Sequence, residues 1–305
     1  MKIVDAHHHF WDTDANYLPW LADRPVKFRY GNYDALKRPY LPDDYRRDSK
    51  EFDVAGTVYV ETEWDPTDPL GEIAWVEGVR EREGIPTVMV AQAWLDADDV
   101  GEVLSGAVSY DFVRGVRHKP RAAERPDKVE RGAAGSMSDP AWRRGFAVLR
   151  DHGMSFDLQT PWWHLAEAVD LAEAVPGVPI ILNHTGLPAD RSKAGLDGWR
   201  EALGLLATVP NAAIKISGLG LAGQAWSAEQ NREVVLEAID IFGVDRVMFA
   251  SNFPVDSLVG SFAEIFEGFM KITQHLGDDT RGALFHDNAA RIYRMDLATA
   301  EEALP

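Results

Sequence analysis

The strongest constraint on the fold of this chain is a repeated alternation of short β-rich runs with longer amphipathic stretches. Eight runs rich in β-branched and other apolar residues cover residues 2–8, 54–61, 86–93, 112–118, 154–160, 178–184, 212–218 and 245–251. Helix-like stretches lie between them, for example at 71–84, 139–153, 163–175 and 227–243. Such alternation predicts parallel βαβ units, and eight strands are the number that closes a barrel. We therefore predict an α/β fold, a (β/α)8 TIM barrel, although an open doubly wound sheet fits the same alternation.

Two segments depart from this alternation. Residues 16–47 are rich in Pro, Tyr and charged residues, and they predict an extended loop after the first strand. Residues 120–137 predict a second loop, which we expect to be mobile. A C-terminal helix is predicted after the eighth strand. Because the sequence contains no low-complexity linker and no second core, we predict a single barrel domain over residues 1–305.

Composition narrows the class of partner. The chain has 31 Lys and Arg residues against 49 Asp and Glu residues, a net charge of -18, which repels nucleic acid and anionic membrane surfaces. It has no cysteine, which excludes disulfides, thiolate metal sites and a cysteine nucleophile. No signal peptide or membrane-spanning run is present in the sequence. We expect a soluble, cytoplasmic protein that acts on a small molecule, and self-association is compatible with the sequence.

Side chains two apart share one face of a strand, so each run divides into two sets. In the second run Val58 and Val60 oppose Tyr59 and Glu61, and in the fifth Phe156 opposes its polar neighbours. The polar sets become more reactive toward the C-terminal ends of the runs. A barrel builds its active site at that end, so we expect the site there.

The opening run places three histidines close together. Asp5, His7 and His9 are predicted on one face, while His8 points the other way and packs against the helix layer. A His-x-His pair suits two ligands of one divalent metal ion, with zinc the leading candidate. Hydrogen-bonded histidines at a barrel mouth fit the same pattern, so both interpretations stay open.

Other strand ends carry further candidates. His184 ends the sixth run, and its position there favours a functional role over a core role. Arg117 and His118 end the fourth run, where Arg117 could clamp a carboxylate, polarise a carbonyl or form an ion pair. Glu61, at the end of the second run, is a candidate metal ligand, general base or partner of Arg117.

Tryptophans follow several of these strand ends within a few residues. They are Trp11, Trp64, Trp94 and the pair Trp162–Trp163. One or two could anchor loops, but the recurrence predicts a pocket with indole walls. Such a pocket suits a ring-shaped substrate such as a sugar, a lactone or an aromatic derivative.

Six motifs in order along the chain resemble one family. They are "DAHHHFWD", "GVRH", "FDLQTPWWHL", "PIILNHTGLP", "RVMFASNFPVD" and "FHDNAARIYRM". Together they resemble the amidohydrolase superfamily, and within it the lactonase-like branch of metal-dependent TIM-barrel hydrolases. That branch includes fuconolactonase-like, rhamnonolactonase-like and pyrone dicarboxylate lactonase-like enzymes.

The resemblance implies roles for particular residues. It makes His7 and His9 the pair that binds metal or polarises the substrate carbonyl, and it places His184 near the scissile carbonyl. Arg117 matches a position that contacts substrate. His164 matches a recurrent histidine after the fifth strand, and we expect it to contact the substrate together with His118 and Gln159.

The sequence departs from the family at the eighth strand. The family's usual aspartate, a general base and often a metal ligand, is replaced by Asn252. An amide cannot accept a proton at neutral pH, so Asn252 can orient water or substrate but cannot be the base. Asp256, Glu61 or a metal ion could activate water instead. Gln159 stands at the fifth strand where a histidine ligand would be expected, so reaction with one divalent ion and reaction without metal both stay open.

Three functions therefore compete. The first is a hydrolase that opens a lactone of the sugar-acid, pyrone or muconolactone type by attack of water on a polarised ester carbonyl. The second is a metal-dependent decarboxylase of an aromatic or unsaturated acid on the same barrel. The third is a non-catalytic small-molecule binding protein, which the loss of the strand-eight aspartate makes conceivable.

Overall fold

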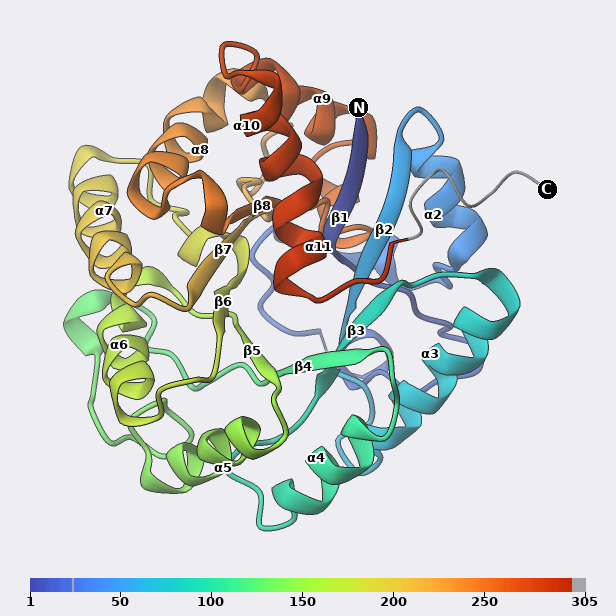
Figure 1. The fold of residues 1–305 in the computed structure, drawn as a ribbon, viewed down its shortest axis with the longest axis vertical. Coiled ribbons are helices and arrows are strands. Elements are labelled where there is room, and N and C mark those ends of the chain that lie inside the picture. The colour runs from blue at the N-terminus through green and yellow to red at the C-terminus, as the bar shows by residue number, and fades with distance from the viewer. Residues whose placement is uncertain (24, 298–305) are drawn as a thin grey trace.

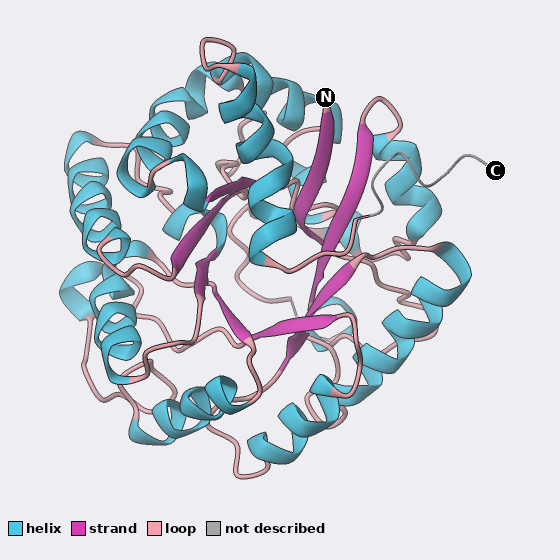
Figure 2. Cartoon of the chain, viewed as in Figure 1, coloured by secondary structure: helices cyan, strands magenta, loops and turns pink. Residues whose placement is uncertain are grey.

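Eight parallel strands form one sheet that curves into a barrel. The computed structural model describes residues 1–23 and 25–297. The strands are β1 (Lys2–His8), β2 (Asp53–Val60), β3 (Val88–Gln92), β4 (Val113–Arg117), β5 (Ser155–Leu158), β6 (Ile180–Leu182), β7 (Ala212–Ile216) and β8 (Val247–Phe249). They lie side by side in chain order (Figure 2), and each pairs in parallel with the next. The predicted (β/α)8 barrel is confirmed.

The ring closes where the chain leaves β8. The backbone N–H of His9 donates to the Phe253 carbonyl at 2.8 Å, and the N–H of Asn252 donates to the His7 carbonyl at 2.8 Å. A parallel bridge also joins His8 to Phe253. These bonds tie the C-terminal end of β1 to the segment after β8, so that the histidines and Asn252 become neighbours.

Helices surround the ring of strands (Figure 1). They are α1 (Pro19–Ala22), α2 (Pro42–Ser49), α3 (Pro69–Glu83), α4 (Val100–Val108), α5 (Pro140–Asp151), α6 (Leu165–Ala174), α7 (Lys193–Ala207), α8 (Ala228–Phe242), α9 (Phe262–Ile272), α10 (Asp278–Gly282) and α11 (Asn288–Ile292). Their ends follow local signals. Asp68 caps α3 by accepting from the Gly71 N–H, and Gly84 ends that helix with a φ of 72°, a backbone conformation that suits glycine.

The interior of the barrel differs between strands. In β2, Val58 and Val60 join an inner apolar cluster with Tyr293, while Tyr59 faces outward and donates a hydrogen bond to Glu72 of α3 at 2.8 Å. The polar set of β2 therefore faces the helix layer along most of the strand. Only Glu61, beyond the last residue of β2, turns toward the mouth.

In β5 and β7 the polar side chains do fill the interior. Lys215 lies 2.6 Å from Asp157, and neither side chain is exposed to solvent. Tyr293 and Asn183 also donate to the Asp157 carboxylate, at 2.9 and 2.8 Å. A buried ion pair is tolerated when such extra hydrogen bonds satisfy it. The Lys215–Asp157 pair therefore adds a polar region to the barrel interior, in addition to the inner apolar cluster that contains Val58 and Val60.

The extended segment after β1 is folded over the barrel. It contains α1, a short 3-10 turn at Asp34–Leu36, and α2, and an antiparallel bridge joins Trp11 to Tyr40. Residues 120–137 hold little regular structure but are anchored at several points. For example, Trp163 Nε1 donates to the Ala123 carbonyl at 3.0 Å.

The predicted C-terminal helix corresponds to α11, and Ala289 of this helix and Tyr293 directly after it pack into the inner apolar cluster. Within residues 1–23 and 25–297, no helix combines the length and apolar character needed to cross a membrane. The assignment of residues 1–305 to one domain stays a prediction, and residues 24 and 298–305 lie outside the described part.

Candidate active site

The histidines of β1 and β6 meet at the barrel mouth. The ring centroid of His7 lies 4.6 Å from that of His184 and 5.0 Å from that of His9. His8 points outward and packs against Tyr45 and other aromatic side chains, with a centroid distance of 4.8 Å. His184 is 175 residues from His9 and 177 from His7 in sequence, and ring closure brings them together.

Asp5 does not share the face of His7. Its carboxylate accepts from Tyr45 of α2 at 2.9 Å and from the Ser251 hydroxyl at 2.6 Å. The pairing of β1 with β2 is irregular between Asp5 and His8, which breaks the period-two alternation at that point. The sequence-based placement of Asp5 beside His7 and His9 is therefore corrected, and Asp5 holds α2 and the segment after β8 against β1.

A cavity of about 300 Å³ opens at this end of the barrel. Its lining includes the imidazoles His9 and His184; the cations Lys27, Arg29, Arg117 and Lys119; the carboxylates and amides Glu61, Glu63, Gln159 and Asn252; and the aromatic rings Trp11, Trp20 and Phe28, and it also includes Val26, Thr62, Leu187 and Val255. Such a mixture of apolar walls and a few convergent polar groups is typical of small-molecule sites. We call this space the catalytic cavity.

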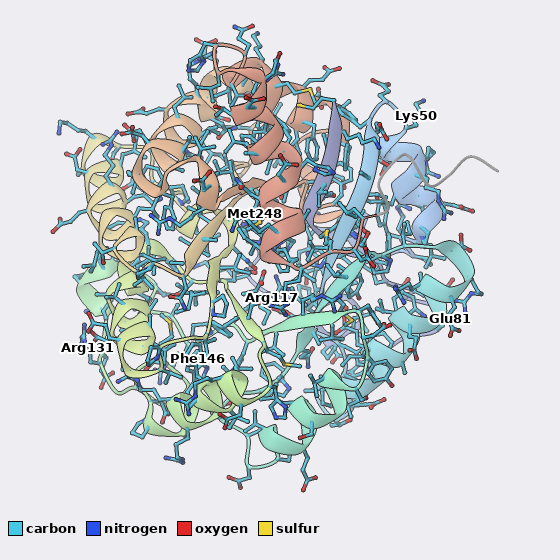
Figure 3. The ribbon with its side chains drawn as sticks, in the orientation of Figure 1. Lys50, Glu81, Arg117, Arg131, Phe146 and Met248 are labelled. Atoms are coloured by element: carbon cyan, nitrogen blue, oxygen red, sulfur yellow. The ribbon has the colours of Figure 1, made fainter. Side chains whose placement is uncertain are left out.

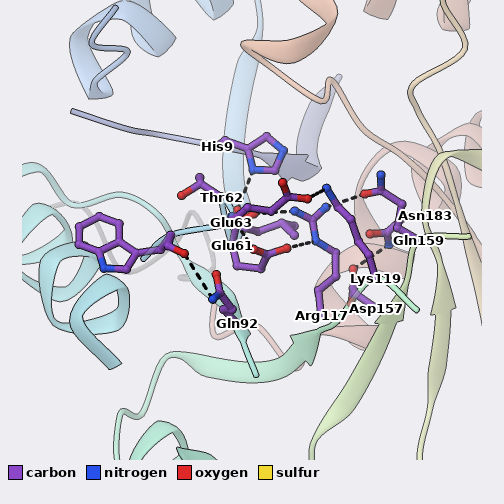
Figure 4. A network of polar contacts seen from close by, with 12 residues as sticks. His9, Glu61, Thr62, Glu63, Gln92, Arg117, Lys119, Asp157, Gln159 and Asn183 are labelled. Carbon is purple, nitrogen blue, oxygen red and sulfur yellow. Dashed lines mark hydrogen bonds and ion pairs between the residues drawn. The ribbon is translucent and has the colours of Figure 1, made fainter. Parts of the chain in front are cut away.

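Arg117 is the best-anchored cation of the cavity and lies near the centre of the ring of strands (Figure 3). It is 3% exposed, and its Nε contacts the Glu61 carboxylate. Its Nη2 donates to the Glu61 carbonyl at 2.6 Å, and its Nη1 donates to Gln159 at 3.0 Å (Figure 4). The guanidinium is therefore held rigidly, which suits it to bind developing negative charge on a substrate.

Glu61 serves mainly to hold this arrangement. One of its oxygens contacts Arg117, and the other accepts from the Glu63 N–H at 2.6 Å. Glu63 in turn pairs with Lys119 across the cavity wall (Figure 4). Because both oxygens of Glu61 are engaged, the geometry favours its role as partner of Arg117 among the roles that the sequence left open.

Asn252 and Asp256 form a second polar group. Asn252 Nδ2 donates to Asp256 Oδ1 at 2.6 Å, and Tyr30 OH donates to the same oxygen at 2.9 Å. The Gly218 N–H donates to Asp256 Oδ2 at 3.1 Å, and Arg29 Nη2 lies 3.4 Å from Oδ1. Burial raises the pKa of Asp256 above its usual range, against these stabilising contacts. Asp256 thus anchors Asn252, Tyr30 and Arg29, and only Asn252 and Arg29 of this group line the cavity.

The cavity histidines are neutral. Burial lowers the pKa of His9 and of His184 well below the usual value, and the nearby cations Arg117 and Arg29 lower it further. His9 Nδ1 lies 2.7 Å from the Val60 carbonyl, which can only accept, so Nδ1 carries the proton and Nε2 carries the lone pair. His184 Nδ1 lies 3.0 Å from the Ser217 hydroxyl. His9 is therefore in the protonation state that can accept a proton from water.

Backbone conformation supports a functional role for the strand ends. His184, Thr185 and Asn252 have φ values of 52°, 58° and 56°. Left-handed conformations of residues other than glycine are uncommon and are concentrated at functional sites, because the surrounding structure must maintain them. They direct His184 and Asn252 into the cavity.

The imidazoles at the barrel mouth do not by themselves complete a site for the expected zinc ion. Within the part of the chain that the structure describes, no group of three or more His, Cys, Asp or Glu side chains is arranged to hold a metal ion. Catalytic zinc takes about three protein ligands. His9 keeps only Nε2 as a possible ligand atom, donors surround Asp256, and the cations Arg117 and Lys119 in the same lining repel a divalent ion. Both ring nitrogens of His7 lack a protein partner among the described residues.

The predicted tryptophans separate into three places. Trp11 lines the catalytic cavity, whereas Trp64 and Trp94 line a neighbouring groove. Trp162 packs edge to face with Trp163, at 5.4 Å between ring centroids, and among the described residues it does not line the cavity.

His118 and His164 also lie outside the described lining of the cavity. His118 Nδ1 accepts from the Leu95 N–H at 3.0 Å. His164 accepts from the Ala123 N–H at 2.8 Å through Nε2, while its Nδ1 lies 2.7 Å from Glu167. Both rings hold loops in place through hydrogen bonds, and their expected contact with substrate is not supported by this placement.

Sequence reasoning missed the contribution of the segment after β1. Trp20, Lys27, Phe28 and Arg29 all line the cavity and all come from that segment. The signal was available in the basic and aromatic run "KFRY" at 27–30, because loops after barrel strands form the mouth of the site. Lys119, two residues after Arg117, was missed for the same reason.

The fold and this site define a TIM-barrel enzyme with its polar residues at the C-terminal ends of the strands. A family profile described as "Amidohydrolase" matches residues 4–295. The chain therefore belongs to the amidohydrolase family and is a hydrolase.

The chain is similar over nearly its whole length to proteins of known sequence and structure. "Uncharacterized protein y4mH" of Sinorhizobium fredii is 42% identical, with 97% of this chain and 99% of that protein covered. "L-fucono-1,5-lactonase" of Burkholderia ambifaria is 25% identical, with 98% of both chains covered. A crystal structure of an amidohydrolase from Burkholderia multivorans with bound zinc has a TM-score of 0.80 at 24% identity and covers 97% of this chain and 100% of that one. The last likeness shows the shared fold.

Proposed function

We propose that this hydrolase opens a lactone ring by attack of water on the ester carbonyl. The observation that carries the proposal is the convergence of a neutral His9, His184 and a rigidly held Arg117 on one cavity of about 300 Å³. Relatives named L-fucono-1,5-lactonase and L-rhamnono-gamma-lactonase, at 24–26% identity over nearly the whole chain, support the same reaction class.

Each cavity residue has a role in the proposed reaction. His9 Nε2 accepts a proton from water, whose oxygen bonds to the carbonyl carbon. Arg117 and Lys119 bind the carbonyl oxygen as it gains negative charge. The ring C–O bond then breaks, and the imidazolium of His9 returns the proton to the leaving oxygen, while His184, whose Nδ1 lies 3.0 Å from the Ser217 hydroxyl, stays neutral and offers Nε2 for a hydrogen bond. The products are a hydroxyl group and a carboxylic acid, and one proton is released at neutral pH.

The remaining residues bind and orient the ring. Trp11 and Trp20 offer apolar faces, and Gln159 and Asn252 offer amide groups to ring hydroxyls or carbonyls. The scheme uses no metal ion, and the zinc and chelator assays below test whether one binds at His7 and His9. A small-molecule substrate suits the cavity, while cytoplasmic location and oligomeric state stay predictions.

The test is acid release from a panel of aldonolactones, pyrones and muconolactones, followed with a pH indicator. His9→Gln should abolish turnover. His8→Phe is the matched control: His8 is the residue next to His9, at the end of β1, and it points into an aromatic cluster, so this variant should keep activity near the wild-type level. Equal activity of both variants would contradict the role of His9.

The same panel separates the competing functions. Parallel assays with added zinc and with a chelator test the metal, and a gain of activity with zinc would contradict the metal-free scheme. Carbon dioxide release without a ring-opened acid would indicate a decarboxylase. Tight binding with no product after long incubation would indicate a binding protein.

A further inference from the structure

A second, largely apolar hollow lies beside the catalytic cavity. Among the described residues its lining includes Pro19, Trp20, Val26, Trp64, Pro66 and Trp94. We call it the indole groove. Indole and pyrrolidine rings offer flat apolar faces, and an exposed apolar surface of this kind next to a catalytic site is typical of a binding subsite.

The groove is continuous with the catalytic cavity. Trp20, Val26 and Glu63 line both. Trp20 Nε1 donates to the Thr62 carbonyl at 2.8 Å, which fixes the indole at the boundary. Phe28 stacks on it with 6.0 Å between centroids and an angle of 4°. The boundary is thus preformed, and a molecule in the cavity can reach the groove without rearrangement of this wall.

The size of the cavity limits what fits inside it. Its volume of about 300 Å³ equals roughly ten water volumes, enough for one small ring with short substituents. A larger substituent must leave the cavity. A substituent that extends toward the groove contacts Trp20 and Val26 first and then Trp64. Trp64 is 9% exposed, and its ring centroid lies 6.0 Å from that of Trp75, against which it packs.

We propose that the indole groove binds an apolar ring carried by the lactone, so that the preferred substrates are aryl-substituted lactones rather than bare sugar-acid lactones. The proposal rests on the proposed lactone hydrolysis and names the substrate class of that site. Glu63 and Lys119, paired at the boundary, flank the path between the two binding regions.

The experiment compares an unsubstituted δ-lactone with the same ring bearing a phenyl group on the carbon next to the ring oxygen. The wild type should hydrolyse the phenyl lactone with a kcat/KM about tenfold higher or more. Trp64→Ala should remove most of this preference with little change toward the unsubstituted lactone. Leu205→Ala, a change at an exposed apolar residue of α7, is the control and should keep the preference.

Pro66→Asp is a second variant in case Trp64→Ala fails to fold. Because Pro66 is exposed and lines the groove, this change places a carboxylate in the groove without altering the core. It should also remove the preference. No preference in the wild type, or equal losses on both lactones in both variants, would overturn the proposal. If neither lactone is hydrolysed, the proposed function fails, and binding of the two lactones is then measured by tryptophan fluorescence. Tighter binding of the phenyl lactone, abolished by Trp64→Ala, would support the groove as a binding site for an apolar ring. Equal binding of the two lactones would overturn it.

Discussion

Replacement of Asn252 by aspartate restores the residue that is usual for the family, yet the structure predicts that it harms this protein. Asn252 Nδ2 donates to Asp256 Oδ1 at 2.6 Å, and both side chains are 1% exposed. Asn252→Asp replaces this donor with a second carboxylate. The φ of 56° at this position is tolerated by both Asn and Asp, so backbone strain does not contribute.

The magnitude follows from two known effects. A hydrogen bond to a charged group contributes about 1.5–3 kcal/mol, and two carboxylates that share a site have pKa values separated by roughly 3 units, equivalent to about 4 kcal/mol. We therefore expect the free energy of unfolding to fall by about 4 kcal/mol at pH 8. With an unfolding entropy of about 2.1 cal/mol/K per residue, the 305 residues give about 0.64 kcal/mol/K, so the Tm should fall by about 6 °C.

The assay is thermal unfolding at pH 5 and pH 8. The deficit of Asn252→Asp should shrink at pH 5, because acid supplies the proton that the two carboxylates share. The exchanged pair Asn252→Asp/Asp256→Asn keeps one carboxylate and one amide, and should recover about half of the loss. A variant within 1 °C of the wild type at pH 8, or a deficit independent of pH, would refute the reasoning.

Three further outcomes are expected. Lys215→Met leaves Asp157 buried without its cation and should reduce the free energy of unfolding by about 3–5 kcal/mol in chemical denaturation. The double variant Lys215→Met/Asp157→Asn should reduce it much less. Equal reductions in the two variants would contradict the ion-pair account. Burial raises the pKa of Glu72 from 4.5 to about 7, so the folded state binds this proton more tightly than the unfolded state. The free energy of unfolding of the wild type should therefore fall as the pH rises from 4.5 to about 7. Glu72→Gln should remove up to about 3 kcal/mol of this fall, as measured by chemical denaturation across that pH range. Arg117→Lys loses guanidinium hydrogen bonds to Glu61 and Gln159. It should lower kcat about 10²–10³-fold in acid-release kinetics and should also lower the Tm by several degrees, because each lost hydrogen bond of this buried charged group contributes about 1.5–3 kcal/mol. A kcat near that of the wild type would argue against Arg117 as the carbonyl-binding group.

Much of the site could be predicted from local sequence because it depends on strand ends. His9, His184, Arg117 and Asn252 each follow a β-rich run, and the C-terminal ends of parallel strands meet at one opening. The face of Asp5 could not be predicted in the same way. The irregular pairing within β1 shifts the alternation by one residue, and such an irregularity has no signature in a single sequence.

The same limit applies to residues whose function depends on distant partners. His164 and His118 look like candidates from their positions after strands, yet each is engaged by the backbone of a loop. Asp256 looks like a replacement base four residues after Asn252, yet donors from Tyr30 and Gly218 surround it. Sequence position gives the strand end, whereas partners from elsewhere in the chain determine whether a side chain is free to react.

The sequence alone determined the class of fold, since alternation of apolar runs is a local property with a period set by backbone geometry. It also determined which chemistry is excluded, through the missing cysteines and the amide at the eighth strand. Only the tertiary structure decided the protonation of His9, the partners of Glu61 and Asp256, and the contribution of residues 27–30 to the cavity wall. These depend on contacts between segments up to about 250 residues apart, which exist only once the ring of strands has closed.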